Sequence, residues 1–146
     1  MSMCVWAAGK SVLCVSACAF SLAWTHSVEK TEWIEHWVLV GHEMHQTQAR
    51  VKGFGAGMEP ASNATLDNGW WVWKPDNPLH LTELHLAASG ATEDGWRVCT
   101  EGQWPTNAPN CINLFEFEGA NQPDLVLIPN RASTTQCRPE LALQKE

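Results

Sequence analysis

A chain of 146 residues is long enough for one domain with one hydrophobic core. Its 45% hydrophobic and 17% charged residues are typical of a globular protein and exclude the disordered and fibrous classes. Acidic residues outnumber Lys and Arg by 16 to 9, and the formal charge is −7. We therefore expect neither a nucleic-acid partner nor docking on an anionic membrane surface.

The N-terminal residues have two interpretations. Residues 4–8 and 11–15, with a turn at Gly9 and Lys10, fit a β-hairpin. Residues 15–18 (Val-Ser-Ala-Cys) resemble a lipobox, which would make Cys18 the N-terminus of a mature lipoprotein. The apolar stretch before Cys18 is short for a signal sequence, which needs about seven to fifteen residues, so we favour the hairpin. No run approaches the roughly 20 apolar residues of a transmembrane segment, and we expect none.

The rest of the chain alternates in the manner of β-strands. Residues 20–28 and 33–40 predict a half-buried hairpin, and Gly41-His42-Glu43 predicts the next turn, followed by a weak strand. Asn68-Gly69 is a strong turn signal before a short strand, and residues 79–87 and 96–100 indicate another hairpin. No segment has a sustained helical period. We therefore expect an all-β fold, a small antiparallel β-sandwich or partly open barrel built from hairpins.

Composition changes near residue 105, because five of the eight prolines lie at or after that position. We expect a β domain over residues 1–104. Residues 105–146 then form a Pro-rich C-terminal extension, with two added strands at 112–117 and 124–128 and a loose tail.

Several ordered motifs resemble a known bacterial family. They are residues 24–30 (Trp-Thr-His-Ser-Val-Glu-Lys), Trp33 and Trp37 on either side of Glu35, and residues 55–60 (Gly-Ala-Gly-Met-Glu-Pro). With residues 68–71 and 96–99 they resemble the domain of unknown function 1850, over roughly residues 4–103. The resemblance implies a small β-rich protein, often encoded beside tripartite ATP-independent periplasmic (TRAP) transporters of the TAXI type. It implies no established activity.

His26 and Glu35 form the sharpest chemical candidate. A hairpin with its tip at residues 30–31 places Trp24 opposite Trp37 and His26 opposite Glu35 on one face of the sheet. A carboxylate can fix an imidazole tautomer for proton transfer or metal binding. A satisfied structural pair is the commoner outcome for such residues, with ligand binding second and catalysis third.

The glycine-rich segment 53–57 is a second candidate. Its backbone N–H groups could approach an anion, although a turn or bulge that needs positive φ is the commoner explanation. We assign no catalytic residue. The candidate ligand- or partner-binding residues are His26, Glu29, Glu35, Gly55, Gly57 and Glu59.

Neither the cysteines nor the other histidines match a metal motif. The six cysteines include no C-x-x-C pair, and isolated thiols are favoured over disulfides. A cytoplasmic location is slightly favoured, and a periplasmic or lipid-anchored one follows if the N-terminus is a signal. His42, Glu43 and His45 do not form H-E-x-x-H, so we interpret them as solvated turn residues. We expect no metal and no cofactor.

These observations favour a non-enzymatic accessory or binding domain linked to TAXI-type solute transport. Its partner would be a transporter component or a small-molecule ligand. One alternative is a small enzyme or metal-binding protein that uses the His26 and Glu35 pair. The other is a lipoprotein matured at Cys18.

Overall fold

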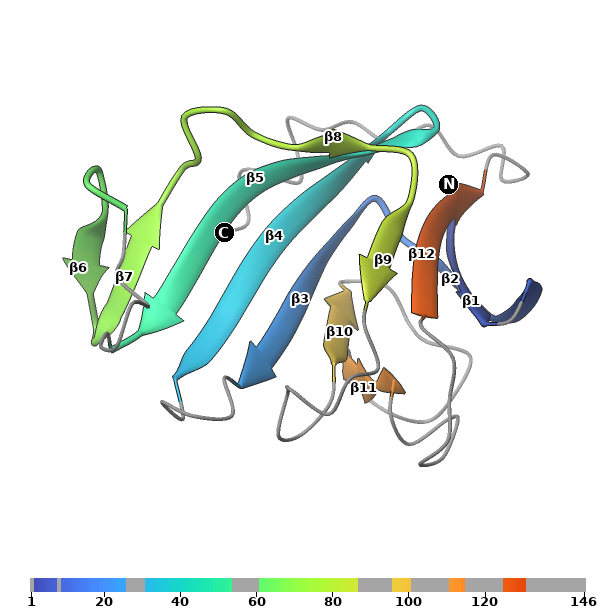
Figure 1. Ribbon diagram of the computed structural model, residues 1–146, viewed down its shortest axis with the longest axis horizontal. Coiled ribbons are helices and arrows are strands. Elements are labelled where there is room, and N and C mark those ends of the chain that lie inside the picture. The colour runs from blue at the N-terminus through green and yellow to red at the C-terminus, as the bar shows by residue number, and fades with distance from the viewer. Residues whose placement is uncertain are drawn as a thin grey trace.

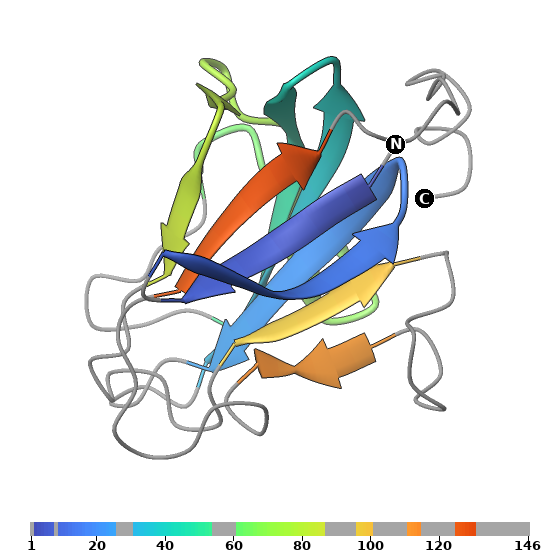
Figure 2. The same ribbon diagram turned by 90° about the vertical axis from the view of Figure 1, so that its right-hand side faces the viewer.

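The computed structural model describes residues 2–7, 9–25, 31–53, 61–86, 96–100, 111–114 and 125–130. Within these ranges the chain forms two antiparallel β-sheets that face each other (Figures 1 and 2). The all-β prediction is confirmed. No helix in the described part of the chain is long and apolar enough to cross a membrane.

The smaller sheet has the strand order β2-β1-β12-β9. It consists of β1 (Ser2–Ala7), β2 (Lys10–Ser16), β12 (Leu125–Asn130) and β9 (Leu84–Leu86). The predicted N-terminal hairpin is confirmed, because Ala7 pairs with Lys10 across a tight turn in which Gly9 has a φ of 76°. β1 lies between β2 and β12, so strands from the two ends of the described chain meet at the centre of this sheet (Figure 2).

The larger sheet has the order β11-β10-β3-β4-β5-β7-β6, and β8 pairs with the first part of β5. Its strands are β3 (Ala19–Thr25), β4 (Glu32–Val40), β5 (Glu43–Lys52), β6 (Thr65–Asp67), β7 (Trp70–Trp73), β8 (His80–Leu81), β10 (Arg97–Thr100) and β11 (Cys111–Asn113). Asn68 and Gly69, with φ of 49° and 88°, form the two-residue turn between β6 and β7. This is the hairpin turn that the Asn-Gly pair predicted.

The core lies between the facing surfaces of the two sheets. The smaller sheet contributes Met3, Val5, Ala7, Leu86, Leu125 and Leu127, and the larger sheet contributes Phe20, Leu22, Trp37, Leu39, Met44, Val98 and Ile112. The side of the larger sheet that carries these residues is called its inner face below, and the opposite side its outer face. The indole of Trp37 is 1% exposed and stacks on Phe20 with ring centroids 6.2 Å apart.

A β-bulge in the β4–β5 pair sets which side chains of β5 reach the inner face. His36 pairs with Gln48 but the next residue, Trp37, pairs with Gln46, so Thr47 is the extra residue. The Thr47 hydroxyl donates to the carbonyl oxygen of His36 at 3.2 Å. Without the bulge, Met44 and Ala49 would face opposite sides, because they are five residues apart in one strand. With it, both are buried on the inner face.

The predicted register of the β3–β4 hairpin is wrong by four residues. Trp24 pairs with Trp33, and Glu35 pairs with Leu22 rather than with His26. Within the described residues, this ladder ends at the pair of Thr25 with Glu32. Apolar residues repeat at every second position of β4. This pattern predicts which side chains face the core, but it is equally compatible with any register that is shifted by an even number of residues. The predicted face assignments therefore hold.

The prediction of isolated thiols is also wrong. Cys4 bonds to Cys14 and Cys99 bonds to Cys111, each across directly paired positions of neighbouring strands, with Cα atoms 4.1 and 4.0 Å apart. Cys18 is disulfide-bonded as well. The sequence pattern missed these bonds because cross-strand pairing, not a fixed spacing in sequence, brings the sulfur atoms together.

Candidate functional site

Glu35 is the only one of the six candidate binding residues that lies within the described chain. It sits at the middle of β4 on the inner face. The other five, His26, Glu29, Gly55, Gly57 and Glu59, lie outside the described residues. The hairpin register removes the predicted cross-strand contact between His26 and Glu35, since Leu22 occupies the position opposite the carboxylate.

The Glu35 carboxylate lies at the edge of the core. Burial raises its pKa above the ordinary value of 4.5, and a hydrogen bond from Nε1 of Trp37 to Oε2, at 3.2 Å, acts in the opposite direction. Desolvation is the larger of the two effects. The inner face thus carries a carboxyl group whose charged form is destabilised.

Replacing Glu35 with Gln should raise stability at neutral pH. A carboxyl whose pKa is higher in the folded state contributes most below its unfolded value, and that contribution is lost as pH rises through the folded pKa. The amide cannot ionise and keeps an oxygen acceptor for Trp37. Urea unfolding should therefore show little difference below pH 4.5 and a growing advantage of the variant above it. Asp76→Asn, at an exposed loop position, is the control and should show no such growth.

Four half-buried indoles form a row across the strands of the inner face, next to the buried core residues. The tryptophan row consists of Trp96, which directly precedes β10, and of Trp24, Trp33 and Trp73, which lie on β3, β4 and β7. Trp24 lies 5.1 Å from Trp96 and 6.1 Å from Trp33 between ring centroids, and Trp33 meets Trp73 edge to face at 5.9 Å. Such tilted and offset contacts are the favoured geometries for aromatic rings.

Small side chains on β5 make room for the row. Val51 pairs with Trp33 and with Trp71, and Ala49 pairs with Glu35 and with Trp73. Both small residues are buried, at 0% and 5% exposure, while the indoles around them stay partly accessible. Nε1 of Trp33 is buried and has no hydrogen-bond partner among the described residues. An unpaired buried donor costs free energy unless a bound group accepts from it.

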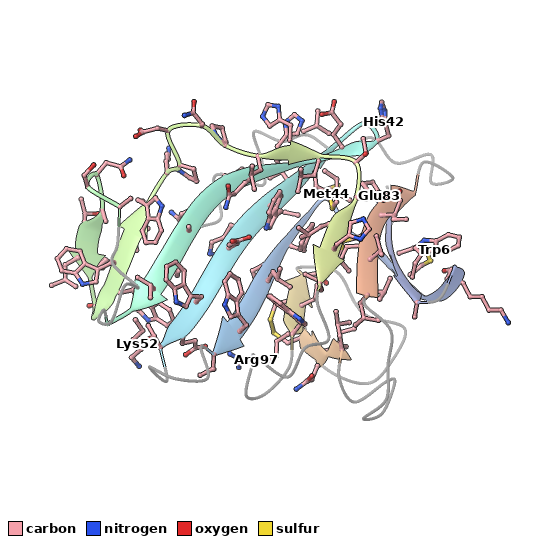
Figure 3. The ribbon with its side chains drawn as sticks, in the orientation of Figure 1. Trp6, His42, Met44, Lys52, Glu83 and Arg97 are labelled. Carbon is pink, nitrogen blue, oxygen red and sulfur yellow. A yellow bond between two sulfur atoms is a disulfide. The ribbon has the colours of Figure 1, made fainter. Side chains whose placement is uncertain are left out.

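The end of the sheet near the row carries two cationic side chains, Lys52 and Arg97 (Figure 3). Nη2 of Arg97 donates to Oε1 of Glu32 at 2.7 Å, which ties β10 to β4 across β3. Lys52 lies over the Trp70 ring at 5.9 Å. By strand alternation both of these pairs belong to the outer face, opposite the side that carries the tryptophan row.

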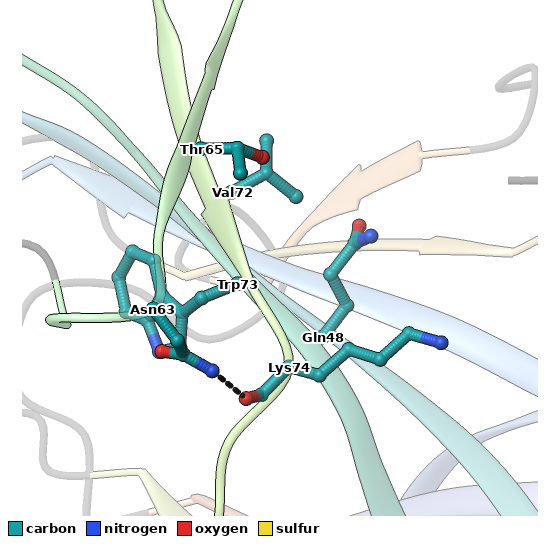
Figure 4. A pocket seen from close by; sticks show the side chains of 6 residues that line it. All are labelled: Gln48, Asn63, Thr65, Val72, Trp73 and Lys74. Atoms are coloured by element: carbon teal, nitrogen blue, oxygen red, sulfur yellow. Dashed lines mark hydrogen bonds between the residues drawn. The ribbon is translucent and has the colours of Figure 1, made fainter.

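A shallow hollow of about 360 Å³ lies over β5, β6 and β7 on the outer face. Figure 4 shows Gln48 and Lys74 projecting along one side of it, and the amide of Asn63 donating to the carbonyl oxygen of Lys74 at 2.9 Å. Its lining residues are Gln48, Asn63, Thr65, Val72, Trp73 and Lys74. These groups suit a small polar molecule, but the hollow is open, and three of its lining residues, Asn63, Thr65 and Lys74, are exposed. Trp73 lines the hollow and also belongs to the tryptophan row.

Sequence reasoning identified the individual tryptophans but not their assembly into one row. The sequence predicts only a short strand after Asn68-Gly69, and the structure brings Trp73 of that strand edge to face with Trp33. Strand alternation alone predicts part of the row, since it places Trp24 and Trp33 on the same face as Glu35.

Comparison with known proteins agrees with the motifs in the sequence. A family model described as a domain of unknown function (DUF1850) matches residues 20–105, more than half of the chain. No curated protein and no solved structure matches.

Proposed function

The chain belongs to the DUF1850 family, whose function is unknown, and from this premise we propose a non-enzymatic accessory domain of TAXI-type solute transport. It acts outside the cytoplasm and binds a protein component of the transport system through the tryptophan row. The single observation that carries the proposal is the row itself, four half-buried indoles on a sheet face beside a partly desolvated carboxyl.

The dimensions of the row favour a protein partner. It runs from β10 to β7, four strand spacings of about 4.8 Å, or roughly 19 Å in all. Tryptophan is among the residues most enriched at binding hot spots, because one indole buries a large area and offers one donor.

The disulfides support the location. Two bridges hold cross-strand pairs, and disulfides persist in the periplasm and outside the cell but are rare in the bacterial cytoplasm. The hairpin of β1 and β2 belongs to the folded domain, since Met3 is 0% and Val5 is 2% exposed. Maturation at Cys18 would delete that hairpin, so the proposal does not include the lipoprotein alternative.

The enzymatic alternative loses its main support. The acid–base pair depended on His26 facing Glu35, and the register places Leu22 there instead. The described polar contact of the Glu35 carboxylate is the indole N–H of Trp37. This contact orients the carboxylate within the aromatic surface, which suits binding better than proton transfer.

Binding to the purified periplasmic component encoded beside the gene tests the proposal. Trp73→Ala should weaken binding at least about tenfold, the typical effect of truncating an interface anchor. Trp70→Ala is the matched control, because Trp70 is equally half-buried on the same strand but faces outward, under Lys52. Calorimetry on the oxidised full chain provides the measurement. Equal affinity of the two variants, or binding only to a small solute, would contradict the proposal.

A further inference from the structure

Two histidines and one glutamate meet on the outer face, at the other end of β5 from the tryptophan row. Glu43 and His45 are two residues apart on β5 and so point to the same side. β8 crosses the first part of β5 and pairs His80 directly with His45. The backbone N–H of Gln46 donates to the carbonyl oxygen of Leu79 at 2.9 Å, which fixes β8 in this position. The cluster is thus set by backbone pairing on both strands.

The donor atoms of the three side chains converge. One ligand atom of each residue lies within 4.8 Å of those of the other two. The imidazoles of His45 and His80 stack with centroids 3.7 Å apart and planes 13° apart. Donor atoms around one tetrahedral zinc ion are about 3.4 Å apart, from metal–ligand distances near 2.1 Å. Small rotations of the partly exposed Glu43 and the exposed His80 would bring the set to that spacing.

One ring nitrogen in the cluster is unsatisfied. Nε2 of His45 is buried and has no hydrogen-bond partner among the described residues. Its neighbour, Oε2 of Glu43, is 3.7 Å away, too far for a hydrogen bond. A buried polar atom without a partner is rare in a folded protein and calls for a bound group. A cation between the two atoms would satisfy both of them.

The chain contains an internal comparison for this geometry. Glu83 and His85 repeat the Glu-x-His spacing, but there Nε2 and Oε2 are 3.0 Å apart, and both side chains are more than half exposed. That pair is a surface ion pair that satisfies itself. The Glu43 and His45 pair differs in its longer separation, its buried nitrogen and the second imidazole stacked on it.

We propose that Glu43, His45 and His80 form a binding site for a divalent transition-metal ion, with zinc as the best fit. Imidazole nitrogen and carboxylate oxygen are the ligands that zinc takes in sites with three protein ligands, where a water completes the tetrahedron. The net charge of −7 favours cation binding in general. The ion would join β8 to β5 and so fasten the segment between β7 and β9 onto the larger sheet. This site is independent of the tryptophan row.

Zinc titration of the oxidised full chain, after chelator treatment, tests the site. Calorimetry should show one zinc ion per chain with micromolar affinity or tighter. His80→Ala should lower the affinity by at least about 100-fold, since even the loss of a residue that only supports a ligand costs 10- to 100-fold. Glu43→Gln should weaken binding as well. His85→Ala is the matched control and should bind zinc like the unaltered chain.

A second readout separates binding from folding. Cobalt should give the visible absorption of a tetrahedral site in the unaltered chain and in His85→Ala, but not in His80→Ala. His80 is exposed, so its loss should leave the fold intact even if His45→Ala does not fold. The proposal is overturned if the unaltered chain binds no zinc in the micromolar range, if His80→Ala binds it equally well, or if His85→Ala loses it to the same extent.

Discussion

A chain that ends at residue 104 should fail to unfold cooperatively, although the match to the family model ends at residue 105. The reason is β12, which lies between β1 and β9 in the smaller sheet. Its Leu125 and Leu127 are 6% and 0% exposed and belong to the central core. Without β12 the β1–β2 pair is an isolated hairpin, and two-stranded hairpins are marginal in water. We therefore expect residues 20–105 to fold stably only together with the strands that precede and follow them in sequence, β1, β2 and β12.

A point substitution tests the contribution of β12 to stability without truncating the protein. Leu127→Ala should lower the free energy of unfolding by about 2–5 kcal/mol, the usual cost of a fully buried Leu-to-Ala change. Val126→Ala, one residue away and on the other face of β12, should cost clearly less because Val126 is partly exposed. Urea unfolding followed by tryptophan fluorescence measures both. If the shortened chain had the same unfolding midpoint as the full one, the role assigned to β12 would be wrong.

Local patterns in the sequence predict most of the strands and their faces, but the predicted hairpin of residues 79–87 with 96–100 is wrong. β9 pairs with β12 in the smaller sheet, whereas β10 pairs with β3 and β11 in the larger sheet. Alternation placed Leu22, Trp24 and Glu35 on one side of the sheet, and the structure keeps them there. The Asn68-Gly69 turn is also predicted from the sequence, because two successive positive φ angles favour Asn and Gly. Local patterns of this kind depend on nearest neighbours along the chain.

Features that depend on non-local pairing were not predictable. Any even shift of the β3–β4 register satisfies the same apolar pattern, so the pattern could not choose Trp33 over Trp37 as the partner of Trp24. The bulge at Thr47 leaves no mark in composition, yet it allows Met44 and Ala49, on either side of it, to face the core together.

The two candidate sites show the same limit. Glu35 was found from its place in an alternating run, but the row beside it requires the strand order that brings Trp96 and Trp73 to the same face. The sequence predicts that His45 is a solvated turn residue, because its neighbours in sequence match no metal motif. Its cluster partner His80 is 35 positions away and arrives only because β8 crosses β5.

Reduction should bring the protein close to its unfolding threshold. Each of the two described disulfides closes a short loop, with sequence separations of 10 and 12 between the paired cysteines. Loop-closure entropy assigns about 3 kcal/mol to a bridge of this size. These two bridges lie in different sheets, so their effects should add to about 6 kcal/mol. Reduction also breaks the bond of Cys18, and the typical total stability is only about 5–15 kcal/mol.

Paired substitutions isolate each bridge from the effect of a reductant. Cys99→Ala with Cys111→Ala should lower the free energy of unfolding by about 3 kcal/mol, and Cys4→Ala with Cys14→Ala by a similar amount. Adding reductant to the first variant should then cost less than adding it to the unaltered chain, since one bridge is already absent. Equal stability of the oxidised and reduced chain would contradict the energetic role assigned to the bridges. A large loss would mean that the fold depends on an oxidising compartment, because the reduced chain would lack the margin that a stable core requires.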